Sequence, residues 1–89
     1  TTGECKRTLN NAHLSDVETF IINKNDELIS GSFDRKIKIW NMTTGVSKRT
    51  LNGHTDRITS FIINENDELV SSSEDFSIKI WNMTNGVCK

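Results

Sequence analysis

The segment Ser30–Asn41 reads Ser-Gly-Ser-Phe-Asp-Arg-Lys-Ile-Lys-Ile-Trp-Asn, and it returns at Ser71–Asn82 as Ser-Ser-Ser-Glu-Asp-Phe-Ser-Ile-Lys-Ile-Trp-Asn. Each copy begins with small residues, continues through a short turn that contains an Asp, and ends in an alternating Ile-Lys-Ile-Trp run. Alternation with a period of two is typical of a β-strand. Both segments are therefore predicted to be β-hairpins.

The two hairpins belong to a longer repeat. Residues 13–48 align with residues 54–89 at a spacing of 41, with 22 identities in 36 positions. Further upstream, Lys6–Asn10 repeats Lys48–Asn52 at a spacing of 42. A period of about 40–45 residues is typical of the four-stranded blade of a β-propeller. The amphipathic 3.6-residue patterns that helical repeats require are absent.

Four strands are expected in each period. In the first they are Val17–Asn23, Glu27–Ser32, Lys36–Asn41 and Val46–Leu51, and in the second they are Ile58–Asn64, Glu68–Ser73 and Ser77–Asn82, with a fourth strand that has only begun at the last four residues. The chain also opens on an unattached fourth strand, Glu4–Leu9. We expect an all-β fold of two four-stranded antiparallel propeller blades that form part of a closed β-propeller.

The pattern Ser-x-Ser-x-Asp-x-x-Ile-Lys-Ile-Trp-Asn, with a His upstream of it, resembles the WD-repeat β-propeller family over essentially the whole chain. The resemblance implies an outer strand for a neighbouring blade (1–10), a first blade (11–51) and a second blade with an incomplete outer strand (52–89). It also implies a rigid, non-catalytic platform for protein–protein interaction. The sequence departs from the family pattern at Ala12, at Asn41 and Asn82, and at Ser72, which stands where the first copy has Gly31. The changes at the two Asn positions and at Ser72 are expected to be mild.

The family resemblance further implies a hydrogen-bonded tetrad inside each blade: His13, Ser30, Asp34 and Trp40 in the first, and His54, Ser71, Asp75 and Trp81 in the second. Ser32 and Ser73 are alternative hydroxyls. A buried indole N–H needs an acceptor, which such a network supplies. The alternative is a Ser-His-Asp hydrolase. The set occurs twice, however, with a Trp each time and without a glycine-rich oxyanion loop.

Turn residues that differ between the copies are candidates for contact with a partner. They are Phe33, Arg35, Arg57, Glu74 and Phe76, which the resemblance places on one face of the propeller. Aromatic and Arg residues are typical anchors of protein interfaces. Alternatively, the two Phe rings pack onto neighbouring blades.

The composition narrows the classes of partner. The net charge is −1, with 26% charged residues of both signs along the chain. A nucleic-acid surface usually shows a clustered basic excess, so none is expected. The sequence has no apolar run of the roughly 20 residues that span a membrane, and no metal or cofactor motif. With two cysteines and no signal peptide, a cytoplasmic setting is expected.

The unattached strand at residues 4–9 and the unfinished last blade predict head-to-tail self-assembly into a closed ring. Three or four chains would give six or eight blades, and four are favoured. In that ring Cys5 of one chain competes with Cys88 of its neighbour for one strand position. The alternative is that the chain is a segment of a longer single-chain propeller.

Overall fold

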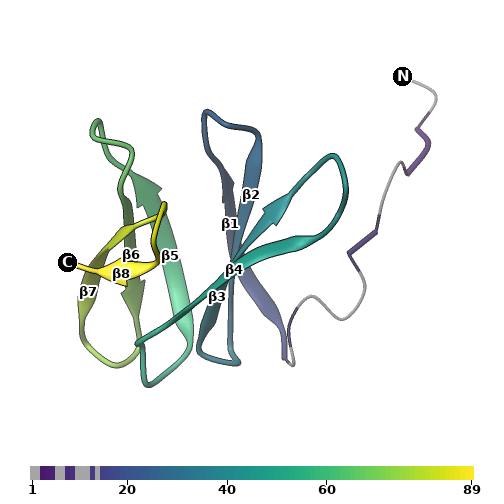
Figure 1. Ribbon diagram of the computed structural model, residues 1–89. Helices are drawn as coiled ribbons and strands as arrows, with labels where there is room; N and C mark the ends of the chain where they lie inside the picture. The colour runs from purple at the N-terminus through teal and green to yellow at the C-terminus, as the bar shows by residue number, and fades with distance from the viewer. Residues whose placement is uncertain (1–2, 6–7, 10–12, 14) are drawn as a thin grey trace.

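The computed structural model describes residues 3–5, 8, 9, 13 and 15–89, and these form two four-stranded antiparallel sheets (Figure 1). The first sheet has the order β1-β2-β3-β4, and the second has the order β5-β6-β7-β8. The strands are β1 (Val17–Ile22), β2 (Glu27–Ser32), β3 (Lys36–Asn41), β4 (Ser47–Asn52), β5 (Ile58–Ile63), β6 (Leu69–Ser73), β7 (Ile78–Asn82) and β8 (Val87–Cys88). The prediction of an all-β fold with two four-stranded blades is confirmed.

Short turns set the register within each sheet. In the β1–β2 turn, the side-chain oxygen of Asn23 accepts hydrogen bonds from the backbone N–H groups of Asn25 and Glu27, at 2.9 and 3.0 Å. Asp26 in the same turn has a φ of 59°, a left-handed conformation that Asp tolerates better than most residues. Asn64 and Asp67 repeat this arrangement in the second sheet. The register then pairs Ile29 with Ile39 across β2 and β3.

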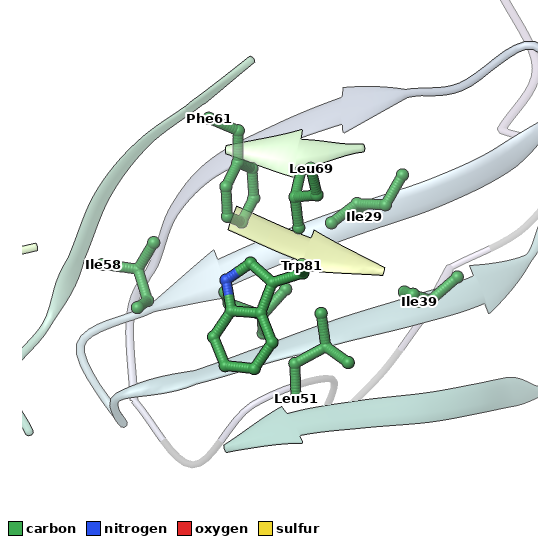
Figure 2. Packing of buried hydrophobic residues seen from close by; sticks show 8 residues of the cluster. Ile29, Ile39, Leu51, Ile58, Phe61, Leu69 and Trp81 are labelled. Atoms are coloured by element: carbon green, nitrogen blue, oxygen red, sulfur yellow. The ribbon is translucent and has the colours of Figure 1, made fainter. Parts of the chain in front are cut away.

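The main hydrophobic core lies between the two sheets (Figure 2). Strand β5 contacts β1 and β2, so the inner strand of the second sheet covers the face of the first. The cluster combines side chains from both sheets: Ile29, Ile37, Ile39, Leu51, Ile58, Phe61, Leu69 and Trp81. Because each sheet contributes only one face, its stability depends on having a neighbour.

The outer edge of the second sheet is incomplete. Strand β8 pairs only Cys88 with Trp81 and Val87 with Asn82, and the Lys89 N–H donates to the Ile80 carbonyl. Along this edge, no described residue pairs with Ile78 or Lys79 in a strand.

The predicted strand Glu4–Leu9 includes residues 6 and 7, which lie outside the described part of the chain. The described residues of this stretch (4, 5, 8 and 9) are not in a strand of the single chain. The described residues include no helix long and apolar enough to span a membrane.

Candidate functional site

The first tetrad is a continuous chain of hydrogen bonds across three elements. His13, just before β1, has its Nδ1 atom 2.9 Å from Oδ2 of Asp34, in the β2–β3 turn. The His13 Nε2 atom lies 2.7 Å from the Ser30 hydroxyl on β2. The Trp40 indole N–H, from β3, donates to the same hydroxyl at 2.9 Å.

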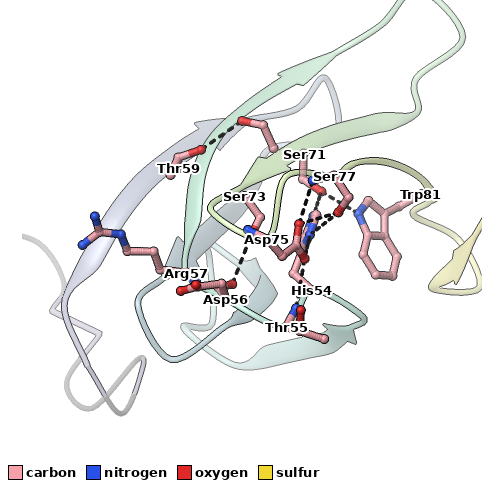
Figure 3. A network of polar contacts seen from close by, with 11 residues as sticks. His54, Thr55, Asp56, Arg57, Thr59, Ser71, Ser73, Asp75, Ser77 and Trp81 are labelled. Carbon is pink, nitrogen blue, oxygen red and sulfur yellow. Dashed lines mark hydrogen bonds and ion pairs between the residues drawn. The ribbon is translucent and has the colours of Figure 1, made fainter.

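The second tetrad repeats this geometry 41 residues later (Figure 3). His54 Nδ1 lies 2.9 Å from Asp75, His54 Nε2 lies 2.7 Å from the Ser71 hydroxyl, and the Trp81 N–H donates to that hydroxyl at 2.8 Å. The His54 and Trp81 rings meet edge to face with centroids 6.3 Å apart. The structure thus brings together all eight residues named from the sequence.

The bonds use Ser30 and Ser71 rather than the alternatives. Ser32 and Ser73 instead accept the backbone N–H groups of Asp34 and Asp75. They hold the turn that presents each carboxylate.

One proton arrangement satisfies every polar atom of a tetrad. The serine oxygen accepts the indole proton, so its own proton is available to Nε2 of the histidine. Nδ1 of the histidine then carries a proton and donates it to the carboxylate. No buried side-chain nitrogen or oxygen of the described residues lacks a hydrogen-bond partner.

Asp75 accepts more bonds than the tetrad alone requires. The Ser77 hydroxyl donates to Oδ1, and the Thr55 N–H donates to Oδ2 at 3.0 Å. These bonds favour the ionised carboxylate. The Ser77 hydroxyl, followed by the Thr55 N–H and His54, holds the pKa of Asp75 well below its usual range.

Burial of the serines limits what the tetrads can do chemically. Ser71 is fully buried and Ser30 is 4% exposed. A nucleophile must reach its substrate, and each of these oxygens already accepts an indole proton. Each tetrad is suited to bracing its sheet through hydrogen bonds that join two strands, the turn between them and the residues before the first strand. Among the described residues, no group of three or more His, Cys, Asp and Glu side chains is placed to hold a metal ion.

The candidate contact residues fall into two groups. The Arg57 guanidinium lies 4.5 Å from the centre of the Phe33 ring in the other sheet, and its Nη2 atom is 3.2 Å from Glu74. These three side chains therefore engage one another across the two sheets. Arg35 and Phe76 are exposed, Phe76 completely, and both have positive φ angles of 73° and 71°.

Two contributions were not predicted from the sequence. The Ser77 hydroxyl donates to Asp75, and the first copy has Lys36 at that position, whose backbone N–H donates to Asp34 as the backbone N–H of Ser77 does to Asp75. A comparison of the copies at these positions provides the signal, since a hydroxyl two residues after the Asp can bond back to it. The contact between Arg57 and Phe33 has no local signal, since 24 positions separate the two residues.

Replacing Asp34 with alanine is expected to destabilise the protein by about 1–3 kcal/mol, because the buried His13 N–H loses its acceptor. Thermal unfolding followed by circular dichroism measures the change. Glu65→Ala, which removes an exposed carboxylate, is the control and should leave the melting temperature nearly unchanged. If Asp34→Ala and Asp75→Ala both melt like the parent protein, the tetrads do not brace the fold.

The tetrads and the two sheets agree with comparisons to known proteins. The family model described as "WD domain, G-beta repeat" matches residues 3–41 and 45–82. A comparison with curated protein sequences gave no match.

Two solved structures are similar to the chain. The WD40 β-propeller domain of Doa1 superposes with a TM-score of 0.88 at 31% identity, over 94% of this chain and 28% of that one. The computationally designed Ika4 protein superposes with a TM-score of 0.78 at 30% identity, over 86% of this chain and 47% of that one. The chain thus spans less than half of each, and members of the family are generally non-catalytic scaffolds. The two family matches cover most of the sequence, and the chain therefore belongs to the WD40 family of G-beta repeats.

Proposed function

We propose that the chain forms a closed β-propeller by head-to-tail association of identical two-blade copies, and that the ring is a non-catalytic platform for protein or peptide ligands. Three or four copies give six or eight blades, within the range of known propellers, and four are favoured. One observation carries the proposal: the two open faces of the chain are equivalent, by the repeat, to the two faces already packed together inside it.

The first open face belongs to the first sheet. Val17 and Phe20 are 49% and 68% exposed. Their equivalents in the second sheet, Ile58 and Phe61, are 0% and 7% exposed because they cover the first sheet. Among the described residues, none buries this face of the first sheet as the first sheet buries Ile58 and Phe61.

The second open face belongs to the second sheet. Ile78 and Ile80 are 73% and 41% exposed. The equivalent residues Ile37 and Ile39 are 0% and 2% exposed, within the cluster between the two sheets. A second copy that places its β1 here would repeat the contact seen between the sheets. Such a contact is head-to-tail, and a fixed rotation for each copy closes it into a ring.

The unpaired edge of β7 supports the same arrangement. In the first sheet Leu51 pairs with Ile37, and Thr50 pairs with Lys38. One family match begins at residue 3 and the other at residue 45. The residues before β1 therefore occupy the same place in their repeat as β4 does in the next one. Leu9 and Thr8 of the next copy would then pair with Ile78 and Lys79, a form of strand addition to an open edge.

Ligand binding is proposed for the face that carries the β2–β3 turns. Phe76 is fully exposed there and has a φ of 71°, a conformation that costs a residue with a side chain about 1–2 kcal/mol. An aromatic ring held at that cost without burial suits a contact anchor. Arg35 occupies the equivalent turn position, and Phe33, Arg57 and Glu74 lie on the same face.

The second candidate is a segment of a longer single-chain propeller. The share of the similar structures that the chain covers, 28% and 47%, favours this candidate. Further blades of the same chain would then cover the two open faces. The two candidates differ in what residues 1–89 do alone, because only the first forms a discrete oligomer.

Deleting residues 1–10 is expected to convert the oligomer into separate chains, because the deletion removes the strand that completes the neighbour's second sheet. Native mass spectrometry of the full chain should show three or four copies, and the truncated chain should show one. Replacing residues 1–10 with a glycine-serine segment of equal length controls for chain length. If the truncated chain forms the same oligomer, strand exchange is refuted.

A further inference from the structure

The contact between the two sheets depends on the absence of a side chain at one position. A β-carbon built on Gly31 would lie 2.6 Å from the Phe61 ring and 2.7 Å from Cγ2 of Ile58. Contacts below 3.0 Å are essentially never seen for a real β-carbon. Strand β5 can therefore approach β2 this closely only because Gly31 has no side chain.

The same position in the second sheet carries a side chain. Ser72 is the equivalent of Gly31, and its hydroxyl bonds to the Thr59 hydroxyl at 3.1 Å. In the proposed ring, Ser72 faces Val17 and Phe20 of the next copy, the equivalents of Ile58 and Phe61. Valine keeps the β-carbon and Cγ2 atom that approach Gly31 inside the chain. The β-carbon of Ser72 therefore excludes an equally close approach between copies.

Charge distinguishes the two contacts as well. Inside the chain, the Arg57 cation lies over the Phe33 ring, an arrangement that is attractive. Between copies, the equivalent of Arg57 is Asp16 of the next copy, and the equivalent of Phe33 is Glu74. In the ring, the Asp16 carboxylate would approach Glu74, whose carboxylate pairs with Arg57 of its own chain at 3.2 Å, so the attractive contact of a cation over a ring is absent there. This second difference arises independently of the first.

From these two differences we infer that the ring contains two unequal kinds of blade interface, a close one inside each chain and a wider, weaker one between chains. Ser72 and Asp16 set the difference. This inference rests on the proposed ring. The partner at the wider interface is a second copy of this chain, and the ring comes apart between chains before the two blades of a chain separate.

The test makes the interface between copies resemble the one inside the chain. Ser72→Gly removes the β-carbon and should lower the concentration at which the ring half-dissociates by about tenfold. Ser72→Ala is the matched control, because it removes the hydroxyl bond to Thr59 and keeps the β-carbon, so it should dissociate like the parent chain. Asp16→Arg places a cation beside Glu74 and should strengthen association further when combined with Ser72→Gly. Sedimentation velocity over a dilution series measures each variant.

The outcomes separate this inference from the ring itself. If the parent chain associates and Ser72→Gly dissociates at the same concentration or a higher one, the inference is overturned and the ring stands. If the parent chain is monomeric at every concentration and the double variant associates, the ring of the parent chain is refuted and the unequal interfaces stand. If the parent chain and all variants are monomeric, both are refuted.

Discussion

Replacing Trp81 with alanine is expected to cost about 3–5 kcal/mol, the usual range for removing a large aromatic side chain from a core. Trp81 is 1% exposed and belongs to the cluster that joins the two sheets. Its ring also meets His54 edge to face, and its N–H donates to Ser71. The substitution therefore removes core volume and one member of a tetrad together. Since small domains are stable by about 5–15 kcal/mol, much of the protein should be unfolded at modest temperature.

Thermal unfolding by circular dichroism measures this effect, and the chain supplies its own control. Trp40→Ala removes the same side chain one repeat earlier, where the Trp is 8% exposed and lies outside the main cluster of described residues. Trp40→Ala should therefore lose less stability than Trp81→Ala. Trp81→Phe keeps a six-membered ring and removes the N–H donor, so its loss of stability should be smaller than that of Trp81→Ala. If Trp81→Ala melts within about 4 °C of the parent, a shift of roughly 1 kcal/mol or less, the core assignment fails.

Gly31→Val is expected to have the second-largest effect, a loss of about 1–3 kcal/mol or more, because the core has no space for the added atoms. The β-carbon alone would meet the Phe61 ring and Ile58 below 3.0 Å. Intrinsic propensity acts in the opposite direction, since valine favours strands and glycine does not. A net loss of stability would show that steric exclusion between the sheets outweighs strand propensity at this position.

A second substitution checks that the loss arises from the contact between the sheets. Phe61→Leu shortens the ring that the new side chain strikes, so the double variant should recover part of the loss. Chemical denaturation of the two single variants and the double variant gives the coupling free energy. If Gly31→Val is as stable as the parent, or if the two substitutions are simply additive, Gly31 does not set the approach of β5.

The strands could be predicted from the sequence because their causes are local. The alternation in Ile37–Trp40 defines β3, and the 41-residue repeat carries the same assignment to β7. Turn residues such as Asn23 bond to backbone groups two and four positions away, so their effect also depends only on residues nearby in the sequence. Observed and predicted strand ends differ by no more than one residue in the first sheet.

Contacts between the sheets could not be predicted in this way, because they depend on which side chains meet after folding. The sequence shows that Ser72 replaces Gly31, and this change was expected to be mild. Only the position of Phe61 against Gly31 shows that a side chain there changes the distance between blades. Likewise, Phe33 is a candidate for contact with a partner or for packing onto a neighbouring blade, and its contact with Arg57 of the other sheet follows from the approach of β5 to the first sheet.

A disulfide between copies would report directly on the proposed exchange of residues 4–9. In the first sheet Lys38 pairs with Thr50, and their equivalents are Lys79 and Thr8 of the next copy. The variant carries Thr8→Cys and Lys79→Cys, with Cys5 and Cys88 replaced by serine. After mild oxidation, it should give a ladder of linked chains on non-reducing electrophoresis.

A closed ring predicts that the ladder ends at three or four chains. Pairing Thr8→Cys with Ile80→Cys should link poorly, since adjacent strand residues face opposite sides of the sheet. Chains that remain single after oxidation, or that link equally well in the shifted pair, would contradict the exchange of residues 4–9 between copies.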